Sequence, residues 1–199
     1  MVQHYAENFL YHFISRMITK IIHISSATER DFLVERIVKL TGAEIFEGIV
    51  VKGNGQDGRD GCRLSHEEIY KRIPKGEDLL VFEDDCVIND ESFLDFIKEN
   101  KDNYDIIYIG VNSVLLDKNN MPYKSSGTHS MWLSYNAIRI YLKYHRNHKE
   151  VDHIWCEIEK LYNLKVLRAN PITKYTVQHE GFVSYITGTL RGKIWPKTW

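Results

Sequence analysis

The sequence predicts an α/β fold in which one mainly parallel sheet is covered by helices. Apolar runs of strand length alternate along the chain with segments of helical periodicity, which is the pattern of parallel sheets. The apolar run at residues 79–82 is continuous, as expected for a central strand buried on both faces. With 199 residues, the chain fits one domain spanning residues 1–199.

The first half of the chain predicts two strand and helix units behind an amphipathic helix. Residues 1–18 space apolar side chains at helical intervals, with too many polar residues for a signal peptide or a membrane span. Residues 20–24 and 43–51 predict strands, and glycines mark residues 53–58 as a polar loop. Residues 28–40 predict a helix whose inward side chains are Phe32, Leu33, Ile37, Val38 and Leu40.

The second half continues the alternation. Ser65 and Glu68 have the spacing of a capping box, which predicts a helix from Ser65 to about Ile73, ended by Pro74. A polar loop is expected at residues 112–126, and the tail after residue 167 has no clear periodicity. The remaining predictions are strands at 105–110, 129–134 and 165–167 and helices at 90–100, 135–144 and 152–162.

Composition limits the classes of partner and compartment. The formal net charge is -1, so no overall field would attract nucleic acid or anionic lipid, and no nucleic-acid partner is expected. Cys62, Cys86 and Cys156 are an odd number at long spacings without a CxxC pair, which favours reduced thiols and an intracellular, cytoplasmic protein. Cys62 and Cys86 stand beside apolar residues and are expected to pack as small hydrophobic side chains.

Three adjacent carboxylates, Glu83, Asp84 and Asp85, follow the apolar strand at residues 79–82. Ligands of open α/β sheets gather at such strand ends. Carboxylates repel one another and are costly to bury without a compensating cation, and oxygen ligands suit Mg²⁺ or Mn²⁺. A loop start or a helix cap is the alternative explanation for the triplet.

Several motifs occur in a fixed order around this triplet. GCRLSHEEIY at 61–70 precedes LLVFEDDCVI at 79–88 and IIYIG at 106–110. With these motifs the sequence resembles glycosyltransferase family 25, which includes bacterial lipooligosaccharide galactosyltransferases and collagen galactosyltransferase domains. The resemblance covers residues 20–188 and extends through further segments, namely Gly127-Thr128-His129, Val151-Asp152-His153, Pro171, Val177-Gln178-His179-Glu180-Gly181 and Ser184-Tyr185-Ile186.

The resemblance implies a GT-A type fold for nucleotide-diphospho-sugar transfer, with a DxD-like metal site. It also implies a metal-dependent inverting glycosyltransferase that moves a sugar, galactose being the commonest case, from a donor such as a UDP-sugar to a glycan or glycoprotein hydroxyl. By analogy, Asp85 would bind Mn²⁺ or Mg²⁺ and His179 could complete the coordination. Asp84 and Glu83 would contact the ribose or the donor sugar.

The resemblance also assigns roles outside the triplet. Asp152 matches the position of a general base, although it could instead cap a helix. Ser65 and His66 fall in the first turn of the predicted helix and could contact the diphosphate, or serve in capping and packing. Arg30 could pair with phosphate or lie exposed on its helix.

Departures from the family pattern leave other functions open. The opening segment reads HISSATER where the family tends to have an asparagine and two arginines, and the stretch before Gly61 is short. Tyr70 stands where a tryptophan is frequent. A catalytically inactive glycan- or partner-binding module is the first alternative. A nucleotidyltransferase is the second, but the sequence has no glycine-rich phosphate loop followed by lysine.

Overall fold

A computed structural model describes residues 17–51, 57–116, 122–144 and 150–179. At its centre lies a six-stranded sheet in the order β2-β1-β3-β8-β5-β9. Strand β8 runs antiparallel to both neighbours and the other five strands are parallel. The strands are β1 (Ile18–His23), β2 (Glu44–Glu47), β3 (Leu79–Glu83), β5 (Ile106–Gly110), β8 (Ser130–Leu133) and β9 (Val166–Arg168).

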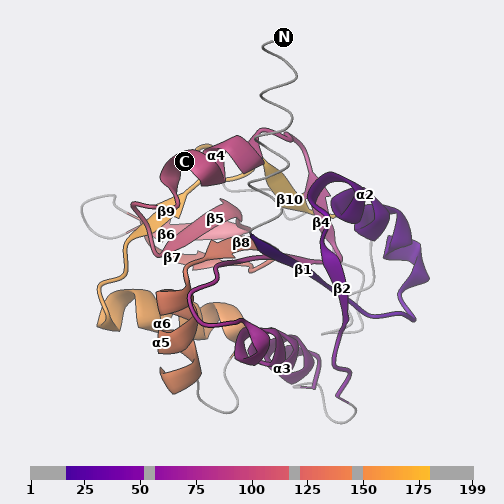
Figure 1. Ribbon diagram of the computed structural model, residues 1–199, viewed down its shortest axis with the longest axis horizontal. Coiled ribbons are helices and arrows are strands. Elements are labelled where there is room, and N and C mark those ends of the chain that lie inside the picture. Colours follow the sequence, from indigo (N-terminus) through magenta and orange to yellow (C-terminus); the bar gives the residue numbers. More distant parts are fainter. Residues whose placement is uncertain (1–16, 52–56, 117–121, 145–149, 180–199) are drawn as a thin grey trace.

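Helices cover both faces of this sheet (Figure 1). Helices α3, α5 and α6 lie on one face, and α2 and α4 lie on the other. The first four residues of β3 are fully buried because each face of the strand meets one of these layers. The helices are α2 (Asp31–Thr41), α3 (Asp57–Arg72), α4 (Phe93–Asn100), α5 (Tyr135–Tyr144) and α6 (Val151–Leu161), with a 3-10 turn, η1, at Thr28–Arg30.

This architecture confirms the predicted α/β class and the mainly parallel sheet flanked by helices, and it is consistent with a GT-A type fold. Two small antiparallel sheets, which the sequence did not predict, accompany the central one. One pairs β4 (Cys86–Ile88) with β10 (Thr176–Gln178), and the other pairs β6 (Ser113–Leu116) with β7 (Pro122–Ser126). The predicted polar loop at 112–126 therefore contains paired strands, because hydrogen bonds between backbones need no apolar alternation.

The start of α3 corrects the capping-box prediction. The helix begins at Asp57, so Ser65 and His66 lie two turns inside it and not in its first turn. The hydroxyl of Ser65 donates to the carbonyl oxygen of Gly61, one turn back, and accepts from the backbone N–H of Ile49. Ser65 therefore attaches the helix to the chain beyond β2 instead of starting it.

The helix predicted at residues 28–40 is divided into η1 and α2. Phe32 is 56% exposed, contrary to the prediction that it faces inward, and Val34 is buried instead. Leu33 and Ile37 are buried as predicted. The predicted N-terminal helix lies outside the described residues except at its end, where Ile18 already belongs to β1. None of the helices within the described ranges has the length and apolarity needed to cross a membrane.

Candidate active site

Two clefts meet at the carboxyl end of β3. The first lies between the ends of β1 and β3, the chain after β2, and α3. Its apolar lining comes mainly from Ile22, Ile24 and the segment 49–51. Five of the predicted site residues line it: Arg30, Ser65, Glu83, Asp84 and Asp85.

The second cleft lies between the end of β3, the start of α6 and β10. Asp152, Glu150, Thr128 and Gln178 line it, so it is more polar than the first. Cys62 and Glu83 line both clefts. Asp152 follows Asp85 by 67 positions in the chain. The fold nevertheless places Asp152 and the acidic triplet in adjoining clefts.

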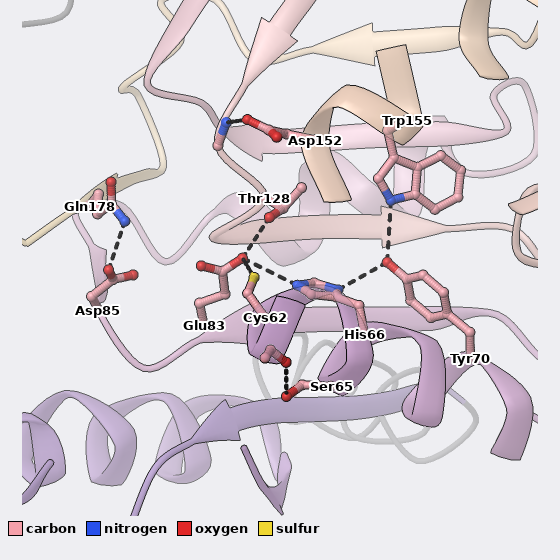
Figure 2. A network of polar contacts seen from close by, with 12 residues as sticks. Cys62, Ser65, His66, Tyr70, Glu83, Asp85, Thr128, Asp152, Trp155 and Gln178 are labelled. Carbon is pink, nitrogen blue, oxygen red and sulfur yellow. Dashed lines mark hydrogen bonds and ion pairs between the residues drawn. The ribbon is translucent and has the colours of Figure 1, made fainter. Parts of the chain in front are cut away.

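Glu83 is held by side chains from α3 and from the segment before β8, as Figure 2 shows. Its Oε1 atom accepts hydrogen bonds from Thr128 Oγ1 at 2.6 Å and from His66 Nε2 at 3.2 Å, and Cys62 Sγ lies 3.9 Å away. Burial raises the pKa of Glu83, but the hydrogen bonds and attraction of His66, with the Thr128 hydrogen bond, lower it to about 2. The carboxylate is therefore charged at neutral pH.

Behind Glu83, a buried polar chain fixes the imidazole of His66 (Figure 2). Trp155 Nε1 donates to the Tyr70 hydroxyl at 3.3 Å, and that hydroxyl lies 3.0 Å from His66 Nδ1. Because Glu83 is charged, Nε2 carries the proton that His66 donates to it, and burial raises the pKa of Tyr70, so the hydroxyl beside Nδ1 stays protonated. His66 is fully buried and reaches the clefts through Glu83.

The side chain of Asp84 contacts residues of β1 and η1, and not those that hold Glu83. It forms a buried ion pair with Arg30, and its Oδ2 lies 3.1 Å from His23 Nδ1. The backbone N–H of Ile24 also donates to Oδ2 at 3.3 Å. Arg30 is 6% exposed, so the exposed helix-face alternative for this residue is wrong. The charge of Arg30 compensates Asp84 at the edge of the first cleft.

Asp85 and His179 lie together where β4 meets β10. The backbone N–H of His179 donates to the carbonyl oxygen of Asp85 at 2.6 Å. Asp85 Oδ2 accepts from Gln178 Nε2 at 2.7 Å, and Asn112 donates to the Gln178 oxygen at 2.8 Å. The ring of His179 packs edge-on against exposed Phe32, with 6.0 Å between centroids.

Asp152 lies in the first turn of α6, one residue after the helix starts at Val151. Glu150 occupies the N-cap position, so the cap alternative for Asp152 is wrong. The carboxylate accepts from the backbone N–H of Gly127 at 3.4 Å (Figure 2). It also accepts from the backbone N–H of His153 at 2.9 Å. Two neutral donors thus orient Asp152 at the second cleft, where it could accept a proton from a bound hydroxyl.

Thr128, Gln178 and His23 are contacts that sequence reasoning missed. Thr128 and Gln178 belong to motifs of the family resemblance, which was the available signal, but their partners lie 45 and 93 positions away. His23 sits in a predicted buried strand and gave no signal of its own. Cys62 packs on the core, as predicted, and also faces Glu83.

Side chains that could bind a metal ion gather at both clefts. Cys62, His66 and Glu83 place one ligand atom each within 4.8 Å of one another, as do Glu150, Asp152 and His153. At Asp85, the potential metal ligand is a carboxylate that also accepts a hydrogen bond from Gln178. The charge of the neighbouring Asp84 is compensated by Arg30. That donor chemistry fits a hard cation such as Mg²⁺ or Mn²⁺.

No protein-family model matches the chain, and no curated protein matches it. Among solved structures, A197 from STIV has 11% identity and a TM-score of 0.49, covering 89% of this chain and 94% of its own. HddC from Yersinia pseudotuberculosis has 10% identity and a TM-score of 0.45, with coverages of 85% and 76%. A glycosyltransferase involved in glycosylation of the major capsid of PBCV-1 has 16% identity and a TM-score of 0.37, with coverages of 62% and 63%. These likenesses assign neither a family nor an activity, and membership of family 25 stays a prediction.

Proposed function

We propose that this protein is a metal-dependent inverting glycosyltransferase that transfers a sugar from a nucleoside diphosphate donor to a hydroxyl of a glycan or glycoprotein. A UDP-sugar, with galactose first, is the proposed donor. One observation carries the proposal: a carboxylate triplet at the end of β3 adjoins a largely apolar cleft on one side and the Asp152 cleft on the other. Such an arrangement suits a donor and an acceptor that react between two surfaces.

The first cleft is the proposed donor site. Its aliphatic side chains from β1 and the segment 49–51 suit the flat faces of a nucleoside, and its polar end suits ribose, diphosphate and sugar. Glu83 is the proposed contact to the donor sugar, because its charged carboxylate lines both clefts. Asp84, Arg30 and Ser65 also line this cleft. We propose that they contact the donor with the parts of their side chains that face the cleft, while they keep their hydrogen bonds within the protein.

The proposed Mg²⁺ or Mn²⁺ would be held by Asp85 and His179, which the backbone hydrogen bond keeps adjacent. When bound, the ion would neutralise charge on the departing diphosphate. Gln178 would orient the Asp85 carboxylate through its 2.7 Å hydrogen bond. His66 would act from behind, by orienting Glu83, instead of contacting the diphosphate itself.

Asp152 is the proposed general base. Inversion in one displacement needs a base on the acceptor side of the sugar, and Asp152 lines the cleft that adjoins the donor site. Its hydrogen bonds from Gly127 and His153 would hold the carboxylate while it takes the acceptor proton. The acceptor hydroxyl would then attack as the bond from the sugar to the diphosphate breaks.

The proposal is tested by incubating the protein with Mn²⁺ or Mg²⁺ and a panel of sugar nucleotides, and by measuring release of the nucleoside diphosphate. We expect release with one donor, and loss of release in Asp85→Ala. Asp95→Ala removes a carboxylate from the exposed face of α4 and is the matched control. If no donor is turned over with any divalent metal, the enzyme proposal is wrong, and nucleotide binding without turnover would identify a binding module.

A further inference from the structure

Cys62 and His66 are four residues apart on α3, so both side chains lie on the same side of the helix. That side meets the end of β3, where Glu83 is located. The distance from Glu83 Oε1 to His66 Nε2 is 3.2 Å, and that from Oε1 to Cys62 Sγ is 3.9 Å. The three atoms form a compact triangle of sulfur, nitrogen and oxygen.

The size of this triangle is that of a metal coordination shell. Ligand atoms bound to one tetrahedral zinc ion lie about 3.3–3.6 Å apart, given zinc to ligand bonds of about 2.0–2.3 Å. The Nε2 to Oε1 distance is already close to this spacing, and a rotation of the Cys62 side chain would bring Sγ closer to both atoms. A thiolate and a carboxylate would also balance the two positive charges, which lowers the cost of holding the ion in a partly buried place.

The surroundings of His66 are those of a metal ligand. A ligating histidine needs its second ring nitrogen fixed by a hydrogen bond, and Tyr70 lies 3.0 Å from Nδ1. With an ion held at Nε2, Nδ1 would carry the imidazole proton and face the Tyr70 oxygen. Thr128 similarly orients Glu83 through its 2.6 Å hydrogen bond. Since Cys62 and Glu83 line both clefts, a fourth ligand such as water has access.

We propose that Cys62, His66 and Glu83 form a three-ligand site for Zn²⁺ or a similar thiophilic divalent cation. The thiolate distinguishes it from the site proposed at Asp85, because sulfur selects zinc over Mg²⁺ and Mn²⁺. Three protein ligands with an open fourth position are the arrangement of reactive zinc sites, whereas structural sites are closed by four. The site does not require transferase activity.

The test uses Co²⁺, which takes the same ligands as Zn²⁺ and is coloured. Reduced, chelator-treated full-length protein is titrated with Co²⁺ while its absorption spectrum is recorded. We expect the first equivalent of Co²⁺ to give a thiolate-to-cobalt charge-transfer band in the near ultraviolet and the visible bands of a four-coordinate ion. One equivalent of Zn²⁺ should abolish these bands by displacing Co²⁺.

Two variants and one control assign the ligands. Cys62→Ser should lose the charge-transfer band, and Glu83→Gln should weaken Co²⁺ binding at least about tenfold. Cys156→Ser changes a buried cysteine on α6 and should keep the wild-type spectrum. Circular dichroism of each metal-free variant checks that the chain is folded. The proposal is overturned if one equivalent of Co²⁺ gives no charge-transfer band, or if Cys62→Ser keeps the band. Because no sugar nucleotide is present, either outcome is separate from that of the transferase test.

Discussion

The three carboxylates at the end of β3 face different partners, although they are adjacent in the chain. Glu83 is bound by donors from α3 and the segment before β8, Asp84 by Arg30 and His23, and Asp85 by Gln178 of β10. Mutual repulsion is relieved because each charge has its own set of donors. The residues therefore divide into one that is neutralised by the protein and two at which a cation or substrate could bind.

Asp84→Ala should destabilise the protein strongly. It would remove the carboxylate that pairs with buried Arg30, and breaking a buried pair in this way costs about 3–5 kcal/mol. The free energy of unfolding in urea measures the effect. Glu29→Ala is the control, because its 3.8 Å contact to Arg30 is partly exposed and should contribute less than about 1 kcal/mol. Equal effects of the two substitutions would show that the buried pair is not important for stability.

Asp152→Asn should reduce turnover without changing the affinity for the donor. The amide keeps the size of the side chain but cannot take a proton, and general bases contribute about 10²–10⁴-fold. Steady-state kinetics, with the donor that the sugar-nucleotide panel identifies, separates kcat from KM. His153→Ala, at the exposed neighbour, should leave kcat within a few fold. A kcat for Asp152→Asn equal to wild type would assign the base elsewhere.

Among the elements, α3 contributes most to the site. Its Gly61 packs on the carbonyl group of Ile49, and Ser65 receives the Ile49 N–H, so this helix fixes the wall of the first cleft. One side of α3 also presents Cys62 and His66 to Glu83. A helix beginning at Ser65 would have lacked the turn that carries Gly61 and Cys62.

Gly61→Ala should therefore separate α3 from the segment after β2. An added Cβ would clash with the Ile49 carbonyl oxygen, and overpacking of this kind costs about 1–3 kcal/mol. Urea unfolding measures stability, and nucleotide titration measures the accompanying loss of donor affinity. Lys71→Ala, on the exposed part of the same helix, serves as the control. A change below about 0.5 kcal/mol for Gly61→Ala would mean that the backbone adjusts without cost.

For the whole molecule, ligand binding should appear as thermal stabilisation. A donor present at about 100 times its Kd adds about 2.7 kcal/mol of stability, which raises the Tm of a chain this long by roughly 5–10 °C. We expect this rise with a UDP-sugar and Mn²⁺, and its loss when a chelator removes the metal. Asp85→Ala should lose the metal-dependent part of the shift. A shift of the same size with and without metal would contradict a metal site at Asp85.

The sequence by itself determined the layers of the fold. The alternation of apolar runs with helical periods is local information, so β1, β3, β5, α5 and α6 were predicted close to their observed bounds. The acidic triplet was likewise visible, because its position after a continuous apolar run follows from chain order alone.

Tertiary structure alone decided the pairings and the start of α3. Strand β10 is too short to give periodicity and is held by β4, about 90 positions earlier in the chain. Ser65 has the spacing of a cap, yet the helix begins two turns before it, in the part where Gly61 packs closely on Ile49. Likewise, no local pattern could show that Arg30 is buried against Asp84 or that Cys62 and His66 meet Glu83. Contacts between distant segments depend on how the layers pack, which periodicity does not specify.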